Sequence, residues 1–373
     1  MLKIANSILN KINIMTHTKE QKKPRIVSGD TPTGRLHLGH WVGSVENRVL
    51  LQDAYDCYFL IANVQAFTTR ADKPDEVRQN IIEILLDYLA VGIDPKRSTI
   101  FLQSEISAIP DLAVFFSMLV PYTRLMRNPT IKDEIRDKGL GDNYSFGFLF
   151  YPISQIADIL IFRPQLVPVG EDQIPHIEMT REVARRFNQL YCGVDPHTED
   201  QDYVAKGGLF PVVDVKLGRS RRLVGTGGPN ADGNLLKMSK SLNNAIFLSD
   251  DPDTIAKKVK GMYTDPQRLK ATDKGRVENN PLWIFHETFN PNQAWVQETE
   301  ERYRQGTIGD VECKNRLIEV LVSIIEPFRQ KRMEYEKNLD QAFAILREGT
   351  EKARQVADET LALAKEAMRQ RFF

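Results

Sequence analysis

The sequence predicts an α/β fold in which a doubly wound, Rossmann-like parallel sheet is followed by an all-helical C-terminal region. Short apolar runs alternate with helical patterns between residues 25 and 170, which is typical of a parallel sheet covered on both faces. No strand pattern remains after about residue 279. The length of 373 residues favours two domains, one large and one small.

Three apolar runs predict the first half of the sheet. Residues 25–29 (RIVSG), 57–64 (CYFLIANV) and 98–103 (STIFLQ) are expected to be strands. Helical spacing predicts helices between them, one from Leu38 to about residue 54 and one over 73–93. Because ligands of such sheets bind at the carboxyl ends of the strands, the segment after residue 29 is a candidate site.

The middle of the chain is expected to be mostly helical. Helical patterns cover about 109–120, 122–138 and 150–162. A short strand over 166–170 (LVPVG) precedes another helix. After a glycine-rich basic segment (217–236), Asp251 as N-cap and Pro252 at the first position predict the start of the next helix.

These patterns divide the chain into four parts. Residues 1–24 are expected to be a disordered extension, with Met15 as an alternative start, and 25–215 the Rossmann-like domain. Residues 216–250 form a glycine-rich basic segment with a Lys-Met-Ser-Lys-Ser loop. Residues 251–373 are expected to be helical, with part of the last helices packed back on the sheet domain.

Composition excludes several classes of protein. Fifty basic and fifty acidic residues cancel, so a polyanionic partner would meet a local basic face rather than a basic protein. The three cysteines (Cys57, Cys192 and Cys313) form no CxxC, which excludes a short-spaced zinc or iron–sulfur framework. No run of about 18 apolar residues predicts a membrane span, and we expect a cytoplasmic protein.

The segment 31–44 (TPTGRLHLGHWVGS) places His37 and His40 in a glycine-rich turn. Three interpretations compete: a metal site, an acid/base pair, and a turn that binds phosphate. Metal is disfavoured because zinc takes three or four protein ligands and no other histidine is near in sequence. Glycines that allow close backbone approach, and a helix start after the turn, favour phosphate. The small residues of this turn are Thr31, Thr33, Gly34, Gly39 and Gly43.

A second motif strengthens the phosphate interpretation. Residues 237–241 (KMSKS) lie between glycine-rich sequence and the helix that begins after Asp251. Two lysines three residues apart, interleaved with hydroxyls, form a compact set of donors suited to pyrophosphate. A Lys-x-x-Lys pattern by itself usually lies in a solvated loop. The phosphate interpretation therefore depends on finding this pattern together with the histidine turn.

The two motifs together resemble the signatures of class I aminoacyl-tRNA synthetases. HLGH precedes KMSKS by about 200 residues, whereas nucleotidylyltransferases carry a His-x-Gly-His turn without the second motif. Over roughly residues 25–373 the chain is similar to the tryptophanyl-tRNA synthetase family. The segments that carry this similarity are SGDTPTGRLHLGHWVGS, RNPTIKDEI, YPISQIADIL, LVPVGEDQIPHIEMTREVARRFN and LLKMSKSLNN.

This resemblance implies a tryptophan–tRNA ligase. Such an enzyme uses ATP with Mg²⁺ to activate L-tryptophan, releases pyrophosphate, and transfers the aminoacyl group to tRNA(Trp). Members of the family are homodimers whose helical domain reads the anticodon. Three alternatives stay open: a tyrosyl-tRNA synthetase, a stand-alone adenylyltransferase, and a non-ligase paralogue that senses tryptophan or binds RNA.

The resemblance also assigns roles around ATP. The histidines are expected to donate to nucleotide and phosphate oxygens and the lysines to close on the triphosphate, with no metal held by protein side chains. The predicted catalytic residues are His37, His40, Lys132, Lys237 and Lys240. The predicted ATP-binding residues are Thr31, Pro32, Thr33, Gly39, His40, Gly170, Glu171, Asp172, Leu223, Lys237, Met238, Ser239, Lys240 and Ser241.

Substrate choice is assigned to one helical face. Tyr151, Gln155 and Asp158, at spacings of four and three, share that face. A carboxylate on a mostly apolar helix is costly to bury without a donor, and an indole N–H is such a donor. By resemblance, Asp158 accepts that hydrogen bond, while Tyr151 and Gln173 approach the α-ammonium group. The predicted tryptophan-binding residues are Val27, Tyr151, Gln155, Asp158 and Gln173.

Two positions bear on the tyrosine alternative. Tyrosine enzymes carry a tyrosine on the first strand where this chain has Val27. Several tryptophan enzymes carry methionine where this chain has Gln155. The apolar Val27 favours tryptophan, because it leaves Asp158 as the acceptor for a single N–H.

Basic clusters are candidates for an RNA face. Each cluster is equally consistent with a solvated helix surface. They are Arg219, Arg221 and Arg222, then Lys257, Lys258 and Lys260, and finally Arg329, Lys331 and Arg332.

Overall fold

The computed structural model describes residues 23–372 except 138, 142, 221, 222, 269 and 271. Most of the predicted extension therefore lies outside the described residues. Its last two residues are held against the sheet domain. Lys23 donates to the carbonyl of Asp53 at 2.7 Å, and the carbonyl of Pro24 accepts from the Asp56 N–H at 2.9 Å.

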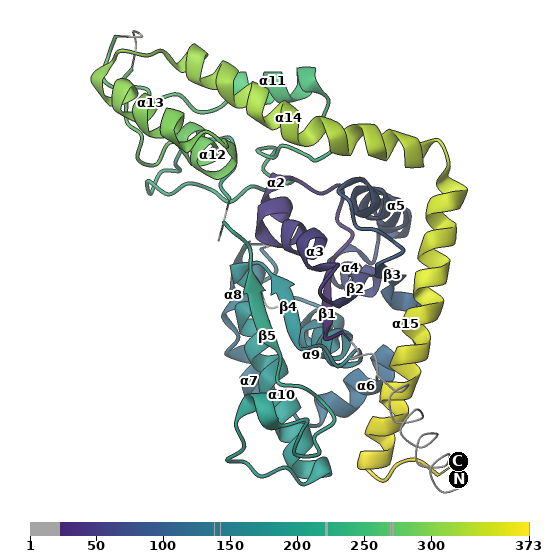
Figure 1. The fold of residues 1–373 in the computed structure, drawn as a ribbon. Coiled ribbons are helices and arrows are strands. Elements are labelled where there is room, and N and C mark those ends of the chain that lie inside the picture. The colour runs from purple at the N-terminus through teal and green to yellow at the C-terminus, as the bar shows by residue number, and fades with distance from the viewer. Residues whose placement is uncertain are drawn as a thin grey trace, which may run out of the picture.

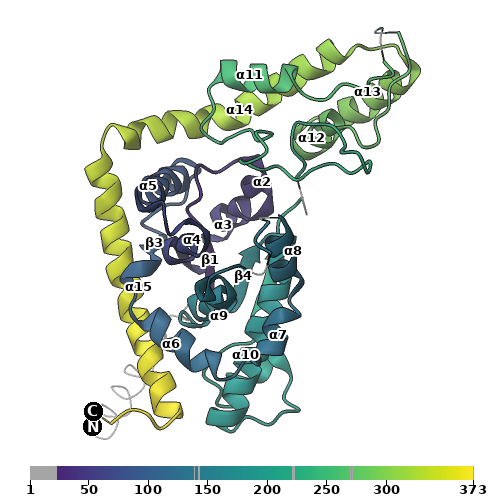
Figure 2. The ribbon, with the colours of Figure 1, turned by 180° about the vertical axis from the view of Figure 1, so that it is seen from behind.

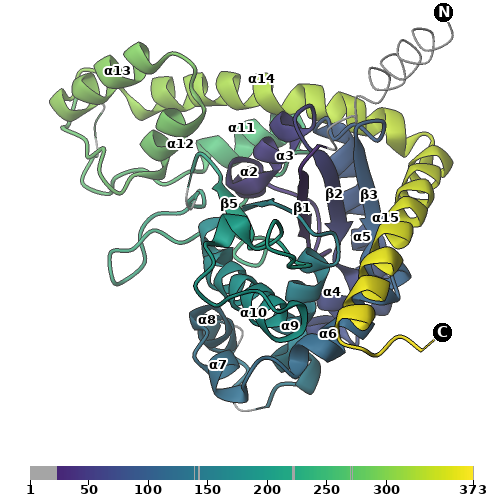
Figure 3. The same ribbon diagram turned by 60° about the horizontal axis from the view of Figure 1, so that its bottom comes forward.

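The core of the fold is a five-stranded sheet in the order β3-β2-β1-β4-β5, with every pair of neighbours parallel. Figure 3 shows β1, β2 and β3 side by side. The order confirms the predicted doubly wound sheet and puts its topological switch point between β1 and β4. The strands are β1 (Arg25–Asp30), β2 (Asp56–Ile61), β3 (Ser98–Leu102), β4 (Leu166–Val169) and β5 (Asp214–Leu217).

The fifth strand was not predicted from the sequence. Its four residues, DVKL, alternate between exposed and half-buried, because β5 is the edge of the sheet. The strand also runs across the domain boundary expected after residue 215. Burial produces the continuous apolar runs that identify β1 to β3, and an exposed edge strand lacks them.

Helices cover both faces of the sheet. Around the first three strands lie α2 (Leu38–His40), a π-helical turn (Trp41–Val45), α3 (Glu46–Leu51), α4 (Asn63–Arg70) and α5 (Pro74–Ala90). The single helix expected from Leu38 is thus two α-helical pieces joined by a π-helical turn. Ile26 of β1 packs in the same apolar cluster as this segment.

Val27, next along β1, points to the opposite cluster, which contains apolar residues of α6, α9 and α10. The helices that follow β3 are α6 (Ala108–Ser117), α7 (Tyr122–Met126), α8 (Pro129–Asp137), α9 (Phe146–Leu160) and α10 (Ile174–Cys192). The single helix expected over 122–138 is broken at the buried Asn128, whose side-chain oxygen accepts from the Thr130 N–H at 3.0 Å. Ser145 caps α9, which begins earlier than expected.

The remaining helices are α11 (Pro252–Lys260), α12 (Pro281–Phe289), α13 (Gln293–Gln305), α14 (Asp310–Glu336) and α15 (Leu339–Ala367). Asp251 caps α11 as predicted. Figures 1 and 2 show α14 crossing above the sheet domain and α15 descending along one side of it. Thr350 of α15 accepts from the Leu102 N–H of β3 at 3.1 Å, so the last helix does pack back on the sheet. Among the described helices, none is long and apolar enough to cross a membrane.

Candidate active site

The switch point of the sheet gathers the two predicted nucleotide segments. β1 ends at Asp30, directly before the histidine turn, and β4 ends at Val169, directly before Gly170. The KMSKS loop bridges the two segments. Lys237 Nζ lies 3.1 Å from Asp172 Oδ2. Lys240 Nζ donates to the Gly34 carbonyl at 2.8 Å and lies 3.3 Å from Thr33 Oγ1.

The two histidines form a capping box at the start of α2, with His37 as the N-cap and His40 as the third helical residue. His37 Nδ1 accepts from the Gly39 N–H, and His40 Nδ1 accepts from the His37 N–H, each at 3.1 Å. The rings are 3.8 Å apart between centroids. In a neutral imidazole, an Nδ1 that accepts leaves Nε2 as the N–H donor. Both histidines therefore carry a donor that the backbone does not use.

The charge state of the histidines follows from their surroundings. Burial, reinforced by nearby lysines, lowers the pKa of His37 far below its ordinary value and that of His40 to about 4. Burial also lowers the pKa of Lys240 to about 8. At neutral pH both histidines are therefore neutral, and each can offer an N–H as a donor.

Beneath the turn lies a buried network that the sequence did not reveal. Asp30 Oδ2 accepts from Arg48 at 2.6 Å and from the Tyr88 hydroxyl at 2.7 Å, and Arg48 also donates to Ser44 Oγ at 2.9 Å. Burial would raise the pKa of Asp30, but Arg48, His40 and Tyr88 outweigh it and lower the pKa to about 2. The network ties the end of β1 to α3 and α5.

The KMSKS loop is shaped by a second segment and by Asn244. Met238 N–H donates to the Leu223 carbonyl at 3.0 Å, which accounts for Leu223 lying beside the loop. Asn244 accepts from the Ser239 N–H at 2.7 Å and donates to the Lys237 carbonyl at 3.2 Å. Ser239 and Ser241 hydroxyls are 2.9 Å apart. Asn244 was not predicted, because it follows the motif.

Lys132 stands apart from the other predicted catalytic residues. Its side chain is exposed on α8. Two residues earlier, Thr130 Oγ1 donates to the Asp172 carbonyl at 3.2 Å. The start of α8 therefore lies beside the segment after β4, although among the described residues no hydrogen bond joins the Lys132 side chain to the histidines or to the KMSKS lysines.

The three predicted substrate residues of α9 do share a face that turns inward. Tyr151 and Asp158 are buried, and Gln155 is half-buried. Gln155 donates to Gln173 Oε1 at 3.0 Å, while its own Oε1 is buried and has no hydrogen-bond partner in the described part of the chain. Gln173, the residue before α10, thus reaches the same face.

Asp158 has a partner that the sequence did not indicate. Gln103, which follows β3, donates from Nε2 to both carboxylate oxygens at 2.8 Å. The Gln103 oxygen accepts in turn from the Val64 N–H at 3.0 Å. Burial raises the pKa of Asp158 to about 7, and Gln103 opposes this only in part. A second donor at this carboxylate would stabilise its charge.

His176 of α10 was likewise missed. Its Nε2 is 3.3 Å from the Tyr151 hydroxyl and its Nδ1 is 3.3 Å from Asn128 Nδ2. Burial lowers the pKa of His176 to about 4. The contact between the buried side chains of Tyr151 and His176 fixes the Tyr151 ring between α9 and α10. Within the described part of the chain, no three His, Cys, Asp or Glu side chains gather to hold a metal ion.

Comparison with known proteins agrees with this geometry. Residues 18–326 match the family of class I tRNA synthetases (W and Y). The chain belongs to the class I tryptophanyl- and tyrosyl-tRNA synthetases. The matched range contains both the histidine turn and the KMSKS loop.

Several tryptophan enzymes are similar along nearly the whole chain. A tryptophan–tRNA ligase of Streptococcus pyogenes is 44% identical over 358 residues, covering 94% of this chain and 99% of its own length. One from Chlamydia caviae is 47% identical over 348 residues, covering 91% and 94%. The tryptophanyl-tRNA synthetase of Campylobacter jejuni, solved with ADP and tryptophan, is 28% identical with a TM-score of 0.75, covering 92% and 99%.

The basic clusters of this synthetase are only partly available to RNA. Arg332 is buried in ion pairs, so its prediction as an RNA contact is wrong. Arg329 pairs with Glu326 at 2.8 Å, and Arg219 pairs with Glu46 at 2.6 Å. Arg221 and Arg222 lie outside the described residues. Among the described members, Arg219, Lys257 and Lys260 are exposed, and the two lysines have no ion pair with a described residue.

Proposed function

We propose that this synthetase is a tryptophan–tRNA ligase, which activates L-tryptophan with ATP and transfers it to tRNA(Trp). Its relatives of 44% and 47% identity carry that name. The observation that carries the choice of amino acid is Asp158, a buried acceptor on α9 whose neighbours Ala157 and Ile159 pack in the same apolar cluster as Val27. A buried acceptor beside apolar side chains suits a large ring with one N–H donor.

Activation needs positioning and charge stabilisation more than proton transfer. The tryptophan carboxylate is already ionised when it attacks the α-phosphorus of ATP and expels pyrophosphate. The neutral Nε2–H groups of His37 and His40 would donate to phosphate oxygens. Lys237 and Lys240, on the loop that spans the switch point, would meet the developing negative charge together with the Mg²⁺ that accompanies ATP.

The remaining parts of ATP and the amino acid fit the surrounding segments. Gly170 to Asp172, at the carboxyl end of β4, would receive the ribose, and Met238 and Leu223 would border the base. Among the described residues, none donates to the buried Oε1 of Gln155. Since Tyr151 and Gln173 lie beside it, this group of side chains suits the α-ammonium group of the substrate.

Amino-acid-dependent ATP–pyrophosphate exchange tests the proposal directly. Exchange is measured with tryptophan and tyrosine in parallel. We expect exchange with tryptophan and a much lower rate with tyrosine. Exchange with tyrosine alone would make the chain a tyrosine enzyme, and exchange with neither would favour a paralogue that binds its ligands without catalysis.

Transfer to tRNA and dimer formation are the further parts of the proposal. The exposed Lys257 and Lys260 on α11 are the basic side chains best placed to meet an RNA backbone. Exposed apolar side chains on α6 and α7 suit a symmetric contact with a second copy: Val114, Met118 and Tyr122. Light scattering on the wild type and on Met118→Glu tests the dimer, since a charge at the contact should yield monomers.

A further inference from the structure

The backbone directly before the histidine turn is held by a side chain from another element. The Leu36 N–H donates to Asp87 Oδ2 of α5 at 2.6 Å, across 51 residues of sequence. Leu36 is fully buried, so its N–H has no access to water and needs a protein partner. Asp87 therefore fixes the backbone of Leu36, the residue directly before His37.

The other oxygen of Asp87 faces the C-terminal helices. Oδ1 accepts from Arg332 of α14. Every nitrogen of this guanidinium is used: it also donates to Glu83 Oε2 at 2.6 Å and to Glu336 Oε1 at 2.8 Å. Burial raises the pKa of Asp87 to about 6 even with Arg332 beside it. Without that cation, the buried carboxylate would lose the charge that is hydrogen-bonded to it.

Leu36 also connects the turn to the KMSKS side of the site. Its carbonyl accepts from the Leu248 N–H at 3.0 Å, and the Leu38 N–H donates to the Ile246 carbonyl at 3.0 Å. The following residue of that segment, Phe247, donates its N–H to Asp250, which pairs with Lys258 of α11 at 2.6 Å. The histidine turn is therefore held on both sides by groups that reach the helical region.

We infer that Asp87 is a positioning residue for the histidine turn, and that Arg332 of α14 acts on activation through Asp87. The helical region would thereby support the first reaction at a distance, without touching ATP or tryptophan. A displacement of the turn moves the Nε2–H donors of both histidines away from the phosphates. The inference rests on the proposed function for its rate effect, and on the structure alone for its effect on the turn.

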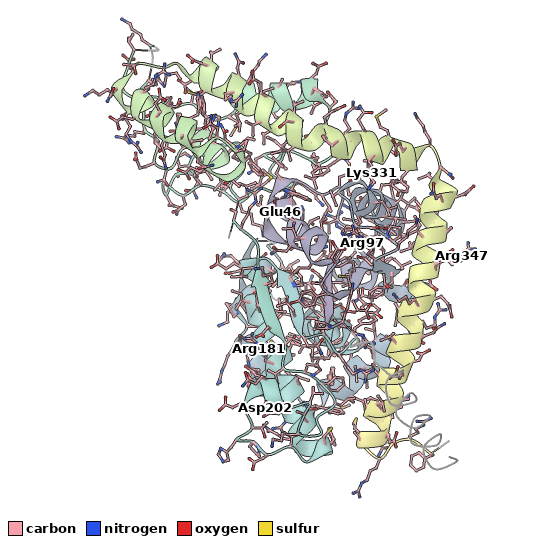
Figure 4. All side chains as sticks on the ribbon, in the orientation of Figure 1. Glu46, Arg97, Arg181, Asp202, Lys331 and Arg347 are labelled. Carbon is pink, nitrogen blue, oxygen red and sulfur yellow. The ribbon has the colours of Figure 1, made fainter. Side chains whose placement is uncertain are left out.

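Three variants test the inference in the full-length protein: Arg332→Met, Asp87→Asn and their combination. Arg347→Met is the matched control, because Arg347 lies on α15 and points away from the sheet domain (Figure 4). ATP–pyrophosphate exchange gives kcat and the KM for each substrate. Hydrogen exchange of the Leu36 amide reports on the turn without any catalysis.

We expect each single variant to lower kcat by about 10- to 100-fold, because small misplacements of catalytic groups are costly. The KM for tryptophan should change little. The double variant should lose scarcely more than the worse single variant, since Arg332 acts through Asp87. The Leu36 amide should exchange faster in all three, and Arg347→Met should behave as wild type.

Two results would overturn the inference. One is a double variant whose loss equals the product of the single losses, which indicates independent roles. The other is an unchanged exchange rate of the Leu36 amide in Arg332→Met. If Arg332→Met does not fold, Arg332→Lys, which keeps the charge, enters the same cycle. Absence of wild-type exchange activity would contradict the proposed function, while the Leu36 amide would still decide this inference.

Discussion

At the scale of single residues, His37 and His40 each use one ring nitrogen to cap the backbone and keep the other as a hydrogen-bond donor. Their Nδ1 atoms cap the backbone, and their Nε2 atoms remain as donors. A capping role alone does not explain why two histidines stand here at the switch point of the sheet, because serine or aspartate caps a helix as well. The two roles are separable by substitution.

His40→Asn separates them. The Asn side-chain oxygen can take the place of Nδ1 and accept from the His37 N–H, but nothing replaces the Nε2–H. We expect an unchanged melting temperature with a loss of activation of about 10²–10³-fold, typical of one lost donor to a charged transition state. Steady-state exchange assays and thermal unfolding measure the two effects. A variant that loses stability and activity together would mean that the histidine is only a cap.

Asp158 makes a prediction about pH. Burial raises its pKa from the ordinary 3.8 to about 7 in the folded chain. Between those values the folded state holds a proton that the unfolded state releases, so Asp158 lowers stability as pH rises.

Asp158→Asn has no carboxyl group at this position, so the loss of stability that Asp158 causes as pH rises is absent from the variant. Relative to wild type, the free energy of unfolding of Asp158→Asn should gain about 2–3 kcal/mol between about pH 5 and pH 7.5. Urea denaturation at both pH values measures it. A difference between the two proteins that does not change with pH would mean that the carboxylate is already ionised at pH 5.

At the scale of elements, the sequence predicted those strands and helices whose buried side chains give a regular apolar pattern. β1 to β4 and the capped start of α11 were predictable, because apolar runs and Asp-Pro are local signals. Edge strand β5 was not, since half of it faces solvent. The partners of Asp158 and Tyr151, Gln103 and His176, come from distant segments, and no local pattern marks them. Nor does sequence distinguish a buried arginine such as Arg332 from an exposed one.

The KMSKS loop offers a test at this scale. Asn244 closes the loop by bonding to both Ser239 and Lys237. Asn244→Ala should leave the part-buried Ser239 N–H and Lys237 carbonyl without this partner and loosen the lysines. We expect kcat for activation to fall about tenfold or more, with little effect on the KM for tryptophan. Asn234→Ala, an exposed position on the same segment, is the control, and equal losses in both would make the effect nonspecific.

At the scale of the whole molecule, the C-terminal helices complete the sheet domain. α14 supplies Arg332 to α5, and α15 runs along the edge strand β3, as Figure 1 shows. Thr350 accepts from the Leu102 N–H, and a Cβ at Gly349 would collide with the carbonyl of Ile100. An edge strand with free N–H groups is prone to pair with other chains, and α15 covers this one.

Gly349→Val tests whether the close packing of α15 against β3 stabilises the whole chain. The added side chain meets the backbone of β3, which cannot move without disturbing β2, so the helix must shift away. We expect a loss of about 1–3 kcal/mol in the free energy of unfolding, as for overpacked cores. Ala344→Val, at an exposed position of α15, places the same side chain in the same helix without the collision. Helix propensity alone would make Ala344→Val the more destabilising of the two, because valine is a poorer helix former than alanine and a better one than glycine. Urea denaturation compares the two variants. Equal destabilisation would show that α15 does not depend on close contact with β3, whereas a larger loss in Gly349→Val, with aggregation on mild heating, would show that the last helix protects the edge of the sheet.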